Sequence, residues 1–308
     1  MSFFQLLEVS LQVSAPLLIL LIIGIIFKRI QLIDDHFVAV GNKVVFKVAL
    51  PCLLFLSMAN KPDGQMINFT LIIYAIIATF ISVASVWILS PLFVDKTQKG
   101  VFTQCAFRGN MGIIGIALCL NAYGETVLAQ VSVYLAFLVI LYNILSVILL
   151  SSTKRGVIIN LVNNPLIIAI TLGYLWSTFD QPLPQIAQTS ISYLAKLTLP
   201  LALLCIGASL EWSSLKENHK IATWCSAFKL VILPLLVCIG AVIIGIKGES
   251  LGILFLMMST PTAAAAYVMS QQMTDHGRLA AEVITLSTIL SPITVTLGLV
   301  ILKYLGHI

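Results

Sequence analysis

One apolar stretch of the sequence, residues 101–124, carries side chains that could bind a small charged molecule. It is long enough to cross a bilayer, yet it contains Gln104, Arg108, Asn110 and several glycines. A charge inside a membrane helix is costly unless it faces protein, water or a ligand. Glycines let a helix open and let a neighbour approach closely. This pattern predicts an interrupted helix that lines a binding site.

The composition indicates an integral membrane protein. Of the 308 residues, 59% are hydrophobic and only 9% are charged, whereas a soluble domain averages about 25% charged residues. A crossing needs about 20 apolar residues, so the chain allows roughly ten crossings and leaves no room for a soluble domain. The net charge of +5 does not require a nucleic-acid partner, because most basic residues fall in the short loops of one side.

Ten apolar segments can be delimited by charges and by glycine or proline clusters. They lie at residues 6–27, 38–59, 69–93, 101–122, 127–150, 163–179, 187–210, 221–246, 250–273 and 279–303. Each is expected to be helical, because an open sheet would leave backbone groups unpaired in lipid. The N-terminus has neither the basic region nor the cleavage site of a signal peptide, so the first segment is expected to remain as a helix.

Lysine and arginine residues indicate the orientation. Loops that follow odd-numbered segments contain Lys28, Arg29, Lys96, Lys99, Lys154, Arg155, Lys216, Lys220 and Arg278, and the other loops contain Lys61, Lys247 and Lys303. The positive-inside rule places the odd loops in the cytoplasm and both termini outside. The basic residues inside segments are Lys43, Lys47, Arg108, Lys196 and Lys229. Most of them are expected to snorkel to a cytoplasmic end.

An internal repeat supports the count of ten segments. Residues 47–51, KVALP, recur as KLTLP at residues 196–200, and residues 129–131, AQV, recur as AEV at residues 281–283. Both spacings are about half the chain, which predicts two five-helix halves, residues 1–153 and 154–308. Because each half has an odd number of crossings, the halves must be inverted. Inverted repeats are typical of secondary transporters, whose substrates bind near the midplane at broken helices.

The repeat also predicts a second helix break. The position equivalent to Gly109-Asn110 is Pro261-Thr262, and a proline in mid-helix removes one hydrogen bond and clashes with the preceding turn. Each break creates a half-helix whose N-terminus lies inside the membrane, with unpaired N–H groups at the positive end of its dipole. Two such ends that approach each other would suit an anion.

The residues around the breaks have alternative roles. Arg108 could bind a carboxylate with two parallel hydrogen bonds, or it could be a snorkelling arginine. Asn110 and Thr262 could donate to the substrate or only cap the half-helices. Three further positions are candidate kinks or hinges: Pro51, Gly112 and Pro200. Glu282 could carry protons, but its position one turn from Arg278 favours a salt-bridged surface acid.

Signatures of other functions are absent from the sequence. No metalloprotease, serine-hydrolase or phosphate-binding motif is found, so no catalytic residue, metal ligand or cofactor is expected. The six cysteines lie in apolar segments without a C-x-x-C pair and are expected to be reduced packing residues. No Asp or Glu is expected at the midplane, which disfavours ion coupling through a central carboxylate.

Several of these motifs resemble the auxin efflux carrier family of membrane transport proteins. Residues 107–118 together with Tyr123-Gly124 resemble its fourth helix, and residues 261–267 and 282–294 resemble its ninth and tenth. Leu50-Pro51 and Asn164-Pro165 agree with the family as well. The resemblance extends over essentially the whole chain.

The resemblance implies a ten-helix inverted repeat like that of bile-acid and sodium/proton transporters, in which helices four and nine cross at their breaks. It implies a scaffold of helices one, two, six and seven beside a domain that moves like an elevator. By the same resemblance, Asn110 would touch the substrate and Pro261 would be the crossover proline of the second half. Two departures, Gly109 and Ala117 where many members have proline, indicate a softer first break.

The sequence therefore predicts a secondary active or facilitative transporter for small organic anions. The family's substrates are auxin in plants and dicarboxylates such as malate or malonate in bacteria. The long insertion of many plant members is missing between Ser151 and Asn160, which implies a bacterial carrier of the plasma (inner) membrane. Two alternatives remain at this point: a sodium- or proton-coupled exchanger on the same fold, and a membrane sensor that binds without transport. Besides substrate and lipid, a homodimer partner is left open.

Overall fold

The computed structural model describes residues 3–60, 67–150, 165–179, 181–210 and 219–308. These residues form helices and their connections, with one isolated backbone bridge and no strand among them. Seven helical spans are long and apolar enough to cross a membrane: Phe4–Arg29, Asp35–Ala59, Phe69–Leu92, Glu125–Leu150, Gln185–Ala208, His219–Ile243 and Gly277–Tyr304. Three shorter apolar helices are Met111–Tyr123, Pro165–Ser177 and Gly248–Met258.

The all-α membrane class predicted from the sequence is therefore confirmed. The described helices agree with the ten predicted segments to within a few residues. Ten crossings arranged as two inverted halves remain a prediction, and the boundary between residues 153 and 154 lies outside the described residues.

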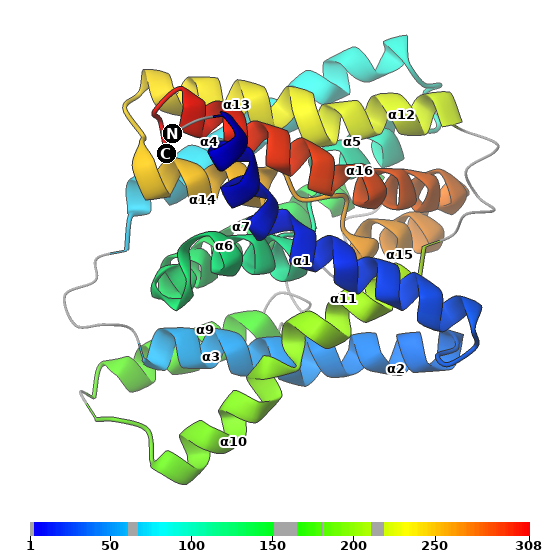
Figure 1. The fold of residues 1–308 in the computed structure, drawn as a ribbon. Helices are drawn as coiled ribbons and strands as arrows, with labels where there is room; N and C mark the ends of the chain where they lie inside the picture. Colours follow the sequence, from blue (N-terminus) through cyan, green and yellow to red (C-terminus); the bar gives the residue numbers. More distant parts are fainter. Residues whose placement is uncertain (1–2, 61–66, 151–164, 180, 211–218) are drawn as a thin grey trace.

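Figure 1 shows the order of the helices along the chain. In the first half they are α1 (Phe3–Arg29), α2 (Asp35–Val44), η1 (Val45–Ala49), α3 (Leu50–Ala59), α4 (Phe69–Leu89), η2 (Ser90–Leu92), α5 (Lys99–Phe107), η3 (Met111–Gly115), α6 (Ile116–Tyr123), η4 (Glu125–Val127) and α7 (Leu128–Leu150). In the second half they are α9 (Pro165–Ser177), α10 (Gln185–Lys196), α11 (Thr198–Ala208), α12 (His219–Ala227), η6 (Phe228–Ile232), α13 (Leu233–Ile243), α14 (Gly248–Met258), α15 (Ala264–Met273) and α16 (Gly277–Tyr304).

Prolines explain several irregular turns within the spans. A proline lacks an N–H and its ring clashes with the carbonyl four residues earlier. The wide π-turn η1 ends at Ala49, two residues before Pro51, and η6 ends at Ile232, two residues before Pro234. Helix α10 ends at Lys196, four residues before Pro200. The predicted kinks at Pro51 and Pro200 thus coincide with real helix irregularities, and π-turns are common at functional sites.

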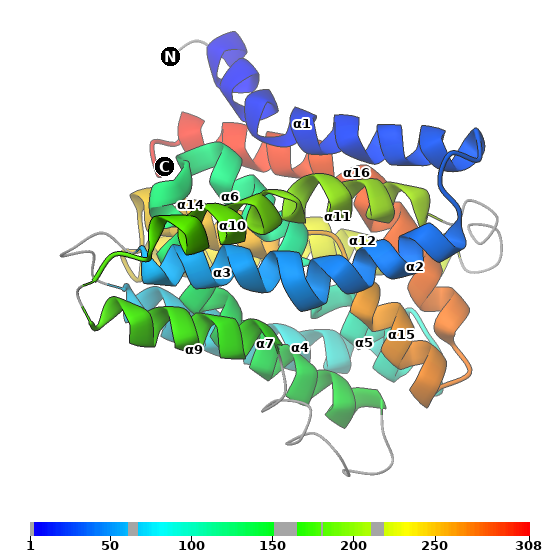
Figure 2. The same ribbon diagram turned by 90° about the horizontal axis from the view of Figure 1, so that it is seen from below.

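Close backbone contacts hold one group of helices together. A Cβ atom added at Gly24 of α1 would overlap the carbonyl of Leu204 in α11, and one at Gly207 of α11 would overlap the carbonyl of Leu21 in α1. Gly173 of α9 approaches the carbonyl of Phe55 in α3 in the same way. Small residues that allow such approach are typical of membrane-helix interfaces. Helices α1, α3, α9, α10 and α11 therefore form one packed group, which Figure 2 shows from a second side.

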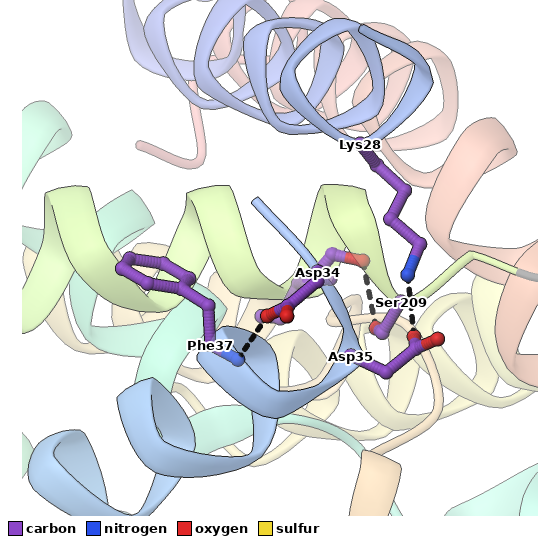
Figure 3. A network of polar contacts seen from close by, with 6 residues as sticks. Lys28, Asp34, Asp35, Phe37 and Ser209 are labelled. Carbon is purple, nitrogen blue, oxygen red and sulfur yellow. Dashed lines mark hydrogen bonds and ion pairs between the residues drawn. The ribbon is translucent and has the colours of Figure 1, made fainter. Parts of the chain in front are cut away.

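A helix cap and an ion pair lie at the turn between α1 and α2, as Figure 3 shows. The side chain of Asp34 accepts a hydrogen bond of 2.7 Å from the Phe37 N–H. Lys28 Nζ lies 2.6 Å from Asp35 Oδ1, but the Asp35 side chain is 94% exposed. An exposed ion pair contributes at most about 1 kcal/mol, so the cap is the stronger determinant of this turn.

Candidate functional site

Two interrupted helices cross at the centre of the molecule. Residues 108–110 separate α5 from η3, and residues 259–263 separate α14 from α15. Gly109 and Thr262 form an antiparallel backbone bridge across these breaks. The Asn110 N–H donates to the Pro261 carbonyl at 2.7 Å, and the Ala263 N–H donates to the Arg108 carbonyl at 2.9 Å. Figures 1 and 2 both place α6 and α14 in the left half of the view and α5 and α15 in the right half.

The local sequence explains both breaks. Pro261 cannot donate to the Met257 carbonyl, which instead accepts a hydrogen bond of 2.9 Å from the Thr260 hydroxyl. At Gly109, a Cβ atom would overlap Thr260 Oγ1 and would lie 2.9 Å from Lys229 Nζ. Pro261 therefore opens one chain segment at the crossing, and the lack of a side chain at Gly109 lets the other segment approach it closely.

The N-terminal ends of two half-helices face the crossing. The first N–H groups of η3 and of α15 have no acceptor within their own helices, so each end is the positive end of a helix dipole. Asn110 precedes η3, and its side chain makes no cap bond and no hydrogen bond to any described residue. The Asn110 side chain is 8% exposed. Its amide is thus free to donate at an electropositive position.

The carbonyl ends of the opposite half-helices already have donors. Lys229 Nζ donates to the Met258 carbonyl at the end of α14, at 2.7 Å. The Thr262 hydroxyl donates to the Cys105 carbonyl near the end of α5, at 2.8 Å. The Thr262 N–H in turn donates to Ser287 Oγ at 3.1 Å. Protein groups therefore compensate the negative ends of both half-helices, and the hydroxyl proton of Thr262 is used inside the protein.

Lys229 is a residue of this site that the sequence interpretation missed. The sequence predicts snorkelling for most basic residues inside segments, but Lys229 is only 2% exposed and its side chain lies at the crossing. It belongs to the π-turn η6, five residues before Pro234. Its position well inside an apolar segment, rather than beside a loop, was the available signal, because a buried membrane charge is a candidate functional residue.

Arg108 contributes its backbone to the crossing and directs its guanidinium into α7. Nη1 donates to the Tyr142 carbonyl at 2.9 Å and to Ser146 Oγ at 2.8 Å, and Nη2 donates to Asn143 Oδ1 at 2.6 Å. The residue is 8% exposed. The snorkelling alternative is therefore wrong, because the side chain is buried and bonded to a neighbouring helix. Its role as a substrate ligand remains a prediction.

The predicted hinge residues lie in or beside elements that contact η3. Gly112 belongs to η3, and a Cβ atom added there would lie 3.7 Å from Leu50, the residue before Pro51. Helix α11, which contains Pro200, also contacts η3. One half-helix thus packs directly on the group formed by α1, α3, α9, α10 and α11. Glu282 is fully buried in α16, so its interpretation as a surface acid is wrong.

Comparisons with known proteins find similar sequences over most of the chain. The family described as membrane transport protein matches residues 9–155 and 150–299. An "Uncharacterized transporter" of Methanothermobacter thermautotrophicus is 25% identical over 300 residues, 95% of this chain and 98% of that protein. Another, of Methanocaldococcus jannaschii, is 22% identical over 305 residues, 94% of this chain and 97% of that protein. A "Putative malonate transporter" of Rhizobium meliloti is 26% identical over 301 residues, 91% of this chain and 93% of that protein.

Proposed function

Because the chain belongs to the membrane transport protein family, which includes the auxin efflux carriers, we propose that it transports small organic anions. The observation that carries the proposal is the bridge between Gly109 and Thr262, which brings two half-helix N-termini together. Such ends bind carboxylates and phosphates. The name of the Rhizobium meliloti relative suggests a dicarboxylate such as malonate as the substrate class.

In the proposed site, the substrate carboxylate accepts a hydrogen bond from the Asn110 amide and from N–H groups at the start of η3 or α15. Gly109 and Pro261 keep the backbone open at this point, and Thr262 fixes the second break through Cys105. The Arg108 guanidinium is hydrogen-bonded to α7. Its positive charge makes the electrostatic potential near the crossing more favourable for an anion. The hydrogen bonds that the substrate carboxylate would accept are charge-assisted, and such bonds are roughly twice as strong as those between neutral groups.

The mechanism that fits this site is elevator-type alternating access between two inverted halves, residues 1–153 and 154–308. The packed group of α1, α3, α9, α10 and α11 would be the scaffold, and the crossing helices would belong to the moving part. Pro51, Gly112 and Pro200 lie where these two parts meet and would act as hinges.

We further propose a bacterial inner-membrane location with both termini outside. The basic ends of α1 and α5 lie at the opposite end of the molecule (Figure 1), as the positive-inside rule requires.

Replacing Asn110 with alanine is expected to lower substrate uptake by at least about tenfold, because a hydrogen bond to a charged group contributes about 1.5–3 kcal/mol. The measurement is uptake of labelled malonate, malate and indole acetate by proteoliposomes that contain the full-length protein. Asn110 makes no side-chain hydrogen bond to described residues, so the variant should melt within about 4 °C of wild type, the shift that about 1 kcal/mol produces.

Asn121→Ala is a suitable control, because Asn121 lies on the same helical segment but donates to Val13 of α1, away from the break. It should retain uptake. If the Asn110→Ala variant takes up substrate at the wild-type rate, Asn110 does not belong to the proposed site. No uptake of any acid by the wild-type protein would contradict the proposed substrate class.

The sodium- or proton-coupled exchanger is the second candidate. Carbonyl groups at helix breaks hold coupling ions in some transporters. Here the Met258 carbonyl accepts from Lys229 and the Cys105 carbonyl accepts from Thr262, which supports a carrier that does not need a sodium ion at these positions. We expect the rate of anion uptake to stay the same, within about twofold, when sodium is replaced by choline, since no ion binding would be lost. Uptake that stops without sodium would favour the exchanger.

A further inference from the structure

A cavity separate from the crossing lies between several parts of the chain. Its volume is about 830 Å³, and its walls are α3, α10, the start of α11 and the corner that joins α6 to α7. The polar side chains that line it include Ser57, Asn60, Thr126, Gln188, Ser192 and Lys196. Helix α10 packs beside α3, as Figures 1 and 2 show. Helix α3 ends and α10 begins at the end of the molecule where both termini lie (Figure 1), so the cavity belongs to that end.

One face of α10 carries a polar stripe that leads into this cavity. Gln188, Ser192 and Lys196 are spaced four residues apart, so they lie above one another on the same helix face. All three line the cavity. The stripe is about 12 Å long at 1.5 Å per residue. Polar residues on a membrane helix almost always face protein or water rather than lipid, which indicates a hydrated path.

Lys196 ends the stripe in the middle of the membrane span. It stands near the centre of the 24-residue span Gln185–Ala208, and its side chain is exposed. Lys196 forms no ion pair with any residue that the structure describes. Glu125 lines the same cavity without pairing with it. A lysine at this depth needs water or an anion to compensate its charge.

Lys47 provides an internal comparison. Like Lys196 it is exposed, stands near the centre of a span and precedes a proline by four residues. Lys47 does not line the cavity, whereas Lys196 does. The two lysines therefore have similar local sequences and membrane depths, and they differ in what their side chains face.

We propose that this cavity is a second anion site, in which the Lys196 ammonium binds a carboxylate of the transported acid before the acid reaches the crossing. The inference rests on the proposed function. The cavity is within the size range of small-molecule sites. Its wall includes Leu120, near the C-terminal end of the helical segment that begins beside Asn110. An acid held by Lys196 therefore lies beside the half-helix whose other end forms the crossing.

The first test measures binding without transport. The full-length protein in detergent is treated with a sulfonated amine-reactive ester, and labelling of each lysine is followed by mass spectrometry with and without malonate or malate. We expect either acid to slow labelling of Lys196 by at least about threefold, because an acid that occupies about two thirds of the sites leaves only the remaining lysines free to react. The rate of labelling of Lys47 should not change. The same protection is expected in Asn110→Ala. Equal labelling of Lys196 with and without both acids, or loss of protection in Asn110→Ala, would overturn the second site.

The second test measures uptake by proteoliposomes. Lys196→Gln should raise KM for malonate about tenfold, which corresponds to about 1.4 kcal/mol of lost binding, with little change in the maximal rate. Lys196→Arg should restore most of the affinity, and Lys47→Gln should behave as wild type. An unchanged KM in Lys196→Gln would overturn the inference. If the wild-type protein takes up none of the acids, the proposed function fails, and the labelling experiment still decides whether Lys196 binds them.

Discussion

Replacing Gly109 with alanine is expected to abolish transport and to lower the free energy of unfolding by about 1–3 kcal/mol, the usual cost of overpacking. The added methyl group would overlap Thr260 Oγ1 and would lie 2.9 Å from Lys229 Nζ. Thr260 is fully buried and bonded to the Met257 carbonyl, so it cannot move away freely. The bridge between Gly109 and Thr262 would have to open, and thermal unfolding together with malonate uptake would report both effects.

Gly112→Ala is the matched control for this substitution. It adds the same methyl group three residues later, where the nearest atom of another residue lies 3.7 Å away, at an ordinary contact distance. We expect it to keep a melting temperature close to that of wild type, because the added methyl group meets no close atom. Equal behaviour of the two variants would show that the fit at Gly109 does not determine the crossing.

Replacing Arg108 with alanine should lower the free energy of unfolding by about 3 kcal/mol, from three interhelical hydrogen bonds of roughly 1 kcal/mol each. The lost bonds are those to Tyr142, Asn143 and Ser146 of α7. The variant loses the side-chain contacts that join α7 to the break. Thermal unfolding in detergent, measured without substrate, checks the effect.

Arg108→Lys separates the charge from the geometry. A lysine keeps the positive charge but cannot donate to all three acceptors in the planar arrangement of arginine. We expect an intermediate loss of stability and partial uptake. A variant Arg108→Ala that melts as wild type but no longer transports would show instead that arginine acts on the substrate and does not stabilise the fold.

The sequence predicted those parts of the fold that depend on apolar runs and on glycine or proline. The positions of the helical segments followed from lengths that match a bilayer. The first break was predicted from the glycines and polar residues of segment 101–124, and the repeat gave Pro261-Thr262 as the counterpart of Gly109-Asn110. Their meeting in space was implied by the family resemblance, and in the structure Gly109 and Thr262 form a backbone bridge.

The polar partners of the site could not be predicted in the same way, because they depend on packing between distant segments. Nothing in the sequence near Arg108 indicates that its guanidinium bonds to residues 142–146 of α7. Lys229 is separated from Met258 by 29 positions, and periodicity does not reveal such a contact. The depth of a charge within a segment is visible in the sequence. By that criterion, Lys229 and Lys196 are both candidate functional residues.

Placing a negative charge at the crossing tests its proposed affinity for anions most directly. The measurement is the shift in melting temperature that malonate or malate produces in wild type and in Asn110→Asp. A ligand that binds only the folded protein raises its melting temperature, so wild type should be stabilised. The aspartate would lie at the N-terminus of η3, where helix dipoles favour negative charge, and it should occupy the position of the substrate carboxylate, so the shift should fall to the part that binding at Lys196 contributes. Equal stabilisation of both proteins by the same acid, or of neither by any acid, would contradict an anion site between the two breaks.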